Sequence, residues 1–166
     1  MSAPADDAVL PPGLSSADVA SALRAFTSAL GADAVLTAEQ AGEFRDPYSY
    51  PGWDDHWPSA VVQPASTEDV QAVVRIARQY KLPLWTTSMG KNNAYGGPAP
   101  RVRGSVVVSM RRLNRVLEVN EELAYAVVEP GVSFFDLCAE LQRRGSRLWA
   151  SIRSRPPTTS TAAWSG

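Results

Sequence analysis

The chain has 166 residues, of which 45% are hydrophobic and 20% charged, and its formal net charge is −1. This length is sufficient for one domain with a sizeable core. The balance of 16 basic against 17 acidic side chains lacks the electrostatic footprint of a protein that binds nucleic acid or an anionic membrane. We therefore expect a small-molecule partner, no nucleic acid and no membrane.

The hydropathy of the chain bears on its cellular location, and its Cys and His content bears on disulfide and metal binding. No apolar run approaches the roughly 20 residues that a membrane-spanning helix needs, and residues 1–7 carry acids where a signal peptide carries basic charge. These properties predict a cytoplasmic protein. Cys138 and His56 are the only residues of their types, so the sequence predicts neither an internal disulfide nor a metal site. Cys138 falls in an apolar helical pattern and is expected to fill the core.

The chain begins with a predicted flexible arm at residues 1–12, which lack any periodicity. Residues 13–57 are expected to form an N-terminal helical and aromatic-loop region. A helix is predicted from 17 to 30, because apolar residues lie along one stripe and Ser15 or Ser16 can cap it. Gly31 is predicted to end this helix.

The sequence patterns that predict secondary structure are weaker in residues 32–57. A short helix or turn is predicted at 37–44, where Thr37 and Gln40 have the spacing of a capping box. Residues 45–57 are rich in aromatic residues, prolines and acids, which suits an ordered irregular loop better than a helix or a strand. We expect the aromatic rings to hold this loop on the domain, with His56 at its surface or packed within it.

A βαβ unit is predicted next. Residues 59–64 read as a short strand, and apolar residues from Val70 recur with helical spacing as far as Tyr80. Ser66 is the predicted N-cap of that helix. Residues 82–85 are the predicted second strand.

The stretch that follows demands unusual backbone conformations. It contains Gly90, the amide pair at 92–93 and the glycine pair at 96–97. Glycines permit positive φ and a close approach of main-chain N–H groups to an anion, and ligand loops in α/β folds lie at the carboxyl ends of strands. The stretch is therefore interpreted as a phosphate cradle, and a plain surface turn between strands is the alternative. Its spacing matches neither the Rossmann fingerprint nor the P-loop.

The C-terminal part is predicted to contain more strands than helices. Residues 104–110 suit a buried strand, 116–120 and 123–129 suit a hairpin, and a helix from 134 to 144 follows a cap at Ser133. The order predicts an α+β fold, a βαβ unit followed by antiparallel strands and a helix. In such a fold the glycine loop and the turn at 129–131 could face one ligand.

Four segments taken together resemble the vanillyl-alcohol oxidase family; they are residues 58–64, 88–101, 113–120 and 129–132. The run GKNNAYGGPAPR resembles its eugenol-oxidase-type and 4-alkylphenol-oxidising branch, with the flavoprotein subunit of p-cresol methylhydroxylase (PCMH) a step further away. The likeness extends over roughly residues 10–150 in colinear order. It implies that residues 58–149 are the N-terminal portion of a PCMH-type FAD-binding domain, with FAD as cofactor.

The resemblance also implies roles for individual residues. The cofactor-binding set is Thr87, Ser88, Met89, Gly90, Lys91, Asn92, Gly96, Pro130 and Gly131. Tyr95 matches a tyrosine that binds the phenolate oxygen of the substrate at the active site, a role that suits a phenol hydroxyl. The alternatives are a Tyr95 ring packed over the loop, a solvated Lys91 and a helix-entry turn at 130–131.

The activity that the resemblance implies is FAD-dependent oxidation of para-substituted phenols. A hydride passes from the benzylic carbon to the flavin, the resulting quinone methide is hydrated or rearranged, and oxygen reoxidises the cofactor. The partners of the full-length enzyme would be FAD and a small phenol, and a homo-oligomer is compatible with this. The competing hypotheses are a non-catalytic nucleotide-binding or partner-binding remnant and a misfolded remnant.

Two departures from the family pattern accompany the resemblance. Ala94 stands where related sequences usually have glycine. Residues 150–166 are rich in Arg, Pro, Ser and Thr and lack the family's glycine-rich continuation, which predicts a disordered or out-of-frame tail. The flavin-linking histidine and the catalytic acid of the family would lie further along. We therefore expect a truncated N-terminal portion that is inactive alone.

Overall fold

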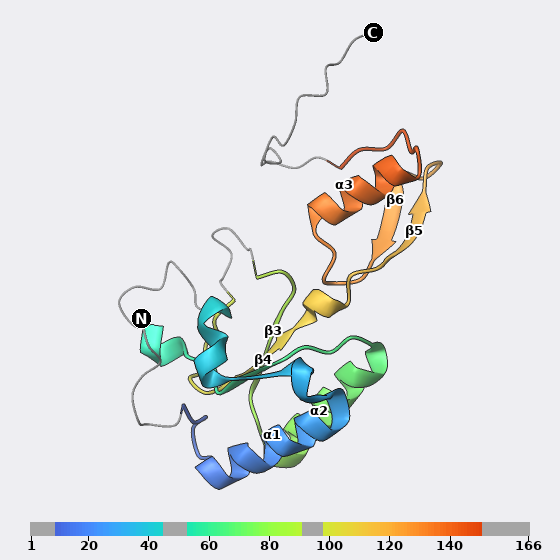
Figure 1. Cartoon of the computed structure of the whole chain (residues 1–166). Coiled ribbons are helices and arrows are strands. Elements are labelled where there is room, and N and C mark those ends of the chain that lie inside the picture. Colours follow the sequence, from blue (N-terminus) through green and yellow to red (C-terminus); the bar gives the residue numbers. More distant parts are fainter. Residues whose placement is uncertain (1–8, 45–52, 91–97, 151–166) are drawn as a thin grey trace.

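The computed structural model describes residues 9–44, 53–90 and 98–150 (Figure 1). The helices and strands are α1 (Ser16–Leu30), β1 (Val35–Thr37), β2 (Ala60–Val62), α2 (Thr67–Tyr80), β3 (Leu84–Thr87), β4 (Val106–Ser109), β5 (Val116–Asn120), β6 (Tyr125–Val128) and α3 (Phe134–Arg143). The 3-10 turns within these ranges are η1 (Ala32–Ala34), η2 (Ala38–Phe44), η3 (Trp53–His56) and η4 (Met110–Arg112).

Each of the three α-helices begins after a serine cap. The hydroxyls of Ser15, Ser66 and Ser133 each accept a hydrogen bond from the backbone N–H three residues later. Such a bond satisfies one of the N–H groups that have no partner inside the helix. The predicted caps are therefore confirmed, with Ser15 rather than Ser16 at the start of α1.

Four strands form one sheet in the order β1-β2-β4-β3. Strand β4 lies between β2 and β3 and is parallel to both, whereas β1 is antiparallel to β2. The predicted α+β class is confirmed, and the antiparallel strands that follow the βαβ unit are β5 and β6, which pair as a hairpin. Strand β1 is too short to show an alternating pattern in the sequence, and it was not predicted.

The core lies on both faces of this sheet. Val62, Val106 and Val108 pack with Phe26 and Val73 on the side of α1 and α2. The alternate positions of the same strands, Val61 and Val107, pack with Phe44 of η2 on the other side. Successive side chains of a strand point to opposite faces, so a strand covered on both sides is apolar throughout.

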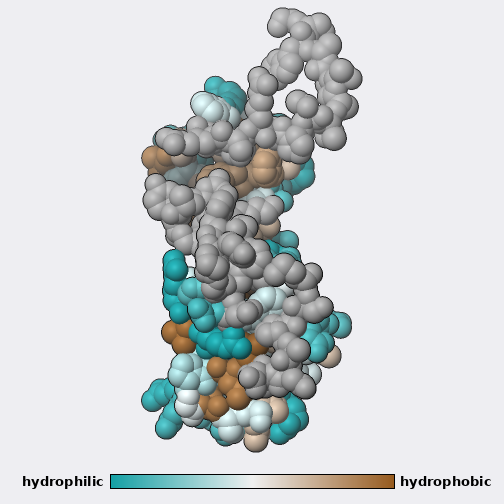
Figure 2. Space-filling model, turned by 90° about the vertical axis from the view of Figure 1, so that its left-hand side faces the viewer, coloured by the Kyte–Doolittle hydropathy of each residue, from teal (hydrophilic) through white to brown (hydrophobic). Residues whose placement is uncertain are grey.

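The hairpin and α3 project away from this body (Figure 1). Large apolar side chains stay exposed there: Leu117, Leu123, Tyr125, Val127, Val128, Phe134 and Phe135. Figure 2 shows apolar side chains on its viewed face both in the lower body and in this upper part. Among the described residues, the two-stranded hairpin therefore lacks the second covering layer that the main sheet has.

Several predicted boundaries differ from the structure. Strand β3 starts at Leu84 rather than 82, because the Leu82 N–H still bonds to the Ala77 carbonyl of α2, at 2.9 Å, and Pro83 has no N–H. Val9 is buried and Leu10 packs against the core, so the contacts of the predicted arm begin before residue 12.

The aromatic loop and the cysteine also differ in detail from expectation. Residues 53–56 form a 3-10 turn, in which His56 Nδ1 lies 3.0 Å from the Pro100 carbonyl oxygen, the packing role expected of it. The Gln40 side chain accepts from the Thr37 N–H as predicted, and the following residues form a 3-10 rather than an α-helix. Cys138 is half-buried on α3, so the prediction of a core position was wrong.

Candidate functional site

The glycine loop begins where β3 ends. Thr87 is the buried last residue of that strand, and Ser88, Met89 and Gly90 follow it at the carboxyl edge of the parallel strands β3 and β4. Gly90 has a φ of +68°, and a Cβ built there would lie 3.2 Å from Cβ of Pro98. The backbone at this position therefore has the left-handed conformation that favours glycine.

Two main-chain donors of this turn lie beside its positive-φ glycine. Among the described residues, the N–H groups of Met89 and Gly90 donate to no backbone carbonyl. Main-chain N–H groups in a glycine-containing turn at a strand end suit an anion such as the diphosphate of FAD. The described part of the loop therefore fits the cofactor, while Lys91, Asn92, Tyr95 and Gly96 lie outside the described residues.

The second predicted part of the site, Pro130–Gly131, has a clear structural purpose. The Gly131 N–H donates to the Leu113 carbonyl at 2.7 Å, and a Cβ there would lie 2.3 Å from the Met110 carbonyl oxygen. Gly131 thus lets the chain entering α3 pass close over η4. This contact supports the helix-entry alternative, and the cofactor role of this pair stays a prediction.

Arg111, which the sequence analysis did not single out, lies beside the glycine turn. Its Nη1 lies 2.8 Å from Glu43 Oε2, its Nη2 is 3.4 Å from the Met89 carbonyl oxygen, and its Cζ lies 5.0 Å from the centre of the Phe44 ring. Its Nε is buried with no hydrogen-bond partner among the described residues. One feature of the sequence could have indicated Arg111. It is a cation two residues after the end of the buried strand β4, which neighbours β3.

A second ion pair closes the base of the hairpin. Glu129 accepts from the backbone N–H of Arg115 at 2.8 Å and from its Nη2 at 2.6 Å. The side-chain hydrogen bond from Arg115 lowers the pKa of Glu129 below its usual value, and the same bond raises the pKa of Arg115. This pair stabilises the strand end from which the Pro130–Gly131 turn departs.

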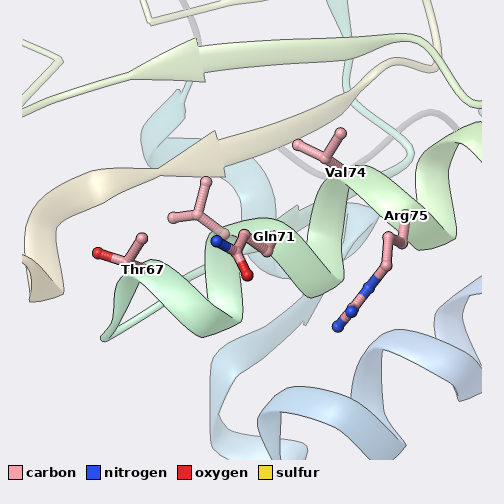
Figure 3. Close-up of a pocket in the computed structure, with 5 residues that line it drawn as sticks. Thr67, Gln71, Val74 and Arg75 are labelled. Atoms are coloured by element: carbon pink, nitrogen blue, oxygen red, sulfur yellow. The ribbon is translucent and has the colours of Figure 1, made fainter.

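A surface hollow of about 420 Å³ lies elsewhere, on α2. Figure 3 shows Thr67, Gln71, Val74 and Arg75 along this helix, and Val70 also lines the hollow. It contains none of the predicted site residues and brings no converging polar groups together. We therefore do not assign the site to it.

Residues 58–166, more than half of the chain, match the family described as "FAD binding domain". The chain belongs to this family. The cofactor is therefore FAD, as predicted, and the relatives below confirm the resemblance to vanillyl-alcohol-oxidase-like proteins of the PCMH type.

Three relatives illustrate the relationship. The chain is 42% identical to 1'-carboxy-chondrochloren decarboxylase of Chondromyces crocatus, over 84% of this chain and 25% of that protein. It is 37% identical to the 4-cresol dehydrogenase [hydroxylating] flavoprotein subunit of Pseudomonas putida, over 78% and 25%. The structure of 4-ethylphenol oxidase from Gulosibacter chungangensis superposes with a TM-score of 0.79 at 42% identity, over 83% and 27%.

This FAD-binding-domain chain thus spans about a quarter of the length of these relatives. Within the described ranges, none of its helices is both long and apolar enough to cross a membrane. In the same ranges, no three His, Cys, Asp or Glu side chains gather as metal ligands would.

Proposed function

We propose that this chain forms the diphosphate-binding part of an FAD-dependent oxidoreductase that acts on para-substituted phenols of the vanillyl alcohol, eugenol or 4-alkylphenol type. The Gly90 turn carries the proposal, because it lies at the end of β3, its φ is positive and, among the described residues, the N–H groups at 89 and 90 donate to no backbone carbonyl. The names of two relatives, a 4-cresol dehydrogenase and a 4-ethylphenol oxidase, support the substrate class.

The proposed roles are divided between residues of the chain and the bound cofactor. Residues 87–92 and Gly96 bind the diphosphate through main-chain N–H groups, and Pro130–Gly131 borders the same cofactor. The Tyr95 hydroxyl donates a hydrogen bond to the phenolate oxygen, which is strongest when that oxygen carries negative charge. Bound FAD supplies the redox chemistry, and the chain binds and orients. The proposed partners are FAD and a small phenol, in a cytoplasmic protein that can form a homo-oligomer.

The relatives differ in reaction, since one is named a decarboxylase and another a dehydrogenase. We infer that this part of the chain contributes cofactor binding to either chemistry. Substrate choice then depends on side chains such as Tyr95.

In the first step of the test, the purified chain is titrated with FAD and binding is monitored by flavin fluorescence. In the second step, the complex is titrated with 4-ethylphenol and the absorption spectrum of the bound flavin is recorded. Saturable binding is expected, with a phenol-dependent spectral shift that Tyr95→Phe weakens. Binding without any phenol response would favour the nucleotide-binding remnant instead. Absence of FAD binding would contradict the proposal as a whole.

A further inference from the structure

The Arg111 guanidinium connects three segments that are far apart in the sequence. It pairs with Glu43 and lies over the Phe44 ring, both from η2, and it donates to the carbonyl of Met89 beside the glycine turn. A Cβ built on Gly90 would lie 3.7 Å from Arg111 Nη2, so the cation is next to the turn.

The backbone of the same residue reaches the second predicted part of the cofactor site. A Cβ built on Gly131 would lie 2.9 Å from the Arg111 carbonyl oxygen. Arg111 is therefore in contact with both the Met89–Gly90 turn and the Pro130–Gly131 turn. Any movement of η4 would shift the two parts relative to each other.

The donors of Arg111 are not fully used. Its Nε is buried and unpaired among the described residues, and a buried unsatisfied donor is unfavourable. The Glu43 partner is 57% exposed, so water weakens that ion pair. A guanidinium whose counter-ion is solvated still attracts a nearby anion.

We propose that Arg111 is an anion-positioning residue of the cofactor site. Its side chain holds the Met89–Gly90 turn in the conformation that accepts the diphosphate of FAD, and its positive charge attracts that group. This inference depends on the proposed function, since it assigns a new residue to the same site. The opposing interpretation is a purely structural brace between η2 and the loop after β3.

The first test compares FAD dissociation constants of Arg111→Gln and Arg111→Lys with that of the parent chain. Arg112→Gln is the matched control, because Arg112 follows directly in η4 and its Nη1 donates to the Gln63 carbonyl at 3.2 Å. Loss of one charge-assisted contact predicts binding about tenfold weaker for Arg111→Gln. Arg111→Lys should be intermediate, and Arg112→Gln within about twofold of the parent. The dependence of affinity on salt should fall in Arg111→Gln alone.

The second test uses Glu43→Gln to distinguish an effect of the Arg111 charge from an effect of its structural contacts. This change removes the competing carboxylate but leaves the contacts of Arg111 with Met89 and Phe44. An anion-positioning Arg111 predicts tighter FAD binding in Glu43→Gln, and a structural brace predicts weaker binding. Weaker binding here, or Arg111→Gln binding FAD like the parent chain, would overturn the proposal.

A third measurement makes failure of the proposed function distinguishable from failure of this inference. Hydrogen exchange at the Met89 and Gly90 amides is followed in the chain without cofactor. Faster exchange in Arg111→Gln but not in Arg112→Gln shows that Arg111 orders the turn even if the parent chain does not bind FAD, and the FAD affinity of Glu43→Gln then distinguishes anion positioning from a structural brace. Equal exchange in both variants rejects the positioning role. If Arg111→Gln does not fold, Arg111→Lys and Glu43→Gln decide in the same way.

Discussion

Gly90 and Gly131 require glycine for different physical reasons. Gly90 has a positive φ at the end of β3, where an L side chain would be strained. Gly131 does not have a positive φ, but the carbonyl oxygens of η4 and Leu113 leave no room for a Cβ. The first requirement belongs to the shape of the candidate site, and the second to the packing that supports it.

Gly131→Ala is expected to destabilise the fold. The added methyl group would lie within 3.0 Å of three carbonyl oxygens, so the backbone must shift, at a cost of about 1–3 kcal/mol. Thermal unfolding measures this loss. Gly42→Ala is the matched control, because an added Cβ there meets open space and its Tm should change little. Equal Tm values for Gly131→Ala and the parent chain would contradict the packing argument.

Gly90→Ala should weaken FAD binding more than it lowers the Tm. The positive φ costs about 1 kcal/mol for a residue with a Cβ, and relaxing it would redirect the N–H groups of the turn. Fluorescence titration with FAD, beside a thermal melt, checks both quantities. A variant with unchanged affinity would show that this turn does not bind the cofactor.

The Glu129–Arg115 pair predicts a pH dependence. The folded state lowers the pKa of Glu129 below its usual 4.5, so its stabilising contribution is complete above that value and is lost as the pH falls through the folded pKa. The Tm difference between the parent chain and Glu129→Gln should therefore be constant from pH 6 to 8 and shrink below about pH 4.5. A difference independent of pH down to 3 would show that the charge is unimportant. The effect is modest, because Arg115 is 73% exposed to water.

At the level of elements, the local sequence specifies where helices begin more strongly than where strands lie. Ser15 and Ser133 belong to full capping boxes with Asp18 and Asp136. These reciprocal bonds use residues three apart, so they form wherever the local sequence allows. The hydrogen bonds from each serine also lower the pKa of its aspartate partner.

Ser133→Ala is expected to cost about 1 kcal/mol, because the alanine leaves the Asp136 N–H without its acceptor. Ser21→Ala in the middle of α1 is the control, since its hydroxyl donates to the Ala17 carbonyl and accepts from the exposed Arg24 side chain, both within the helix, and alanine favours a helix. Chemical denaturation of both variants measures the two free energies. A Ser133→Ala variant as stable as Ser21→Ala would contradict the capping argument.

At the scale of the whole molecule, the two parts of the chain differ in how well they are covered. The β1-β2-β4-β3 sheet is packed on both faces, whereas the hairpin and α3 expose Leu117, Phe134 and other apolar residues. Exposed apolar surface and free strand edges favour association with other chains or dyes. Figure 1 shows the hairpin and α3 as a part of the chain separate from the main sheet.

A double variant with Leu117→Lys and Phe134→Glu should expose less apolar surface. We therefore expect it to bind less of the hydrophobic dye ANS and to associate less with increasing concentration. Val74→Lys, which changes an exposed apolar residue in the α2 hollow, is the control and should have a smaller effect. Fluorescence and sedimentation measure the two properties. Equal dye binding in the parent chain and the double variant would locate the exposed apolar surface elsewhere.

The sequence by itself determined the local structure of this FAD-binding-domain protein. Caps, apolar periodicity and the hairpin involve residues within one element or its neighbour, so α1, α2, α3 and β4–β6 could be predicted with small errors at their ends. The positive φ of Gly90 follows from the same local logic. The cofactor assignment rested on a resemblance, which the family match confirmed.

Only the tertiary structure decided which distant segments meet. It placed β4 between β2 and β3, paired β1 with β2, and brought Arg111 to Glu43 and Met89, which are 68 and 22 residues away. Such contacts depend on which apolar faces can be buried together, and a short stretch of sequence does not carry that information. For this reason the glycine turn could be predicted from the sequence, whereas the contacts of the arginine beside it could not.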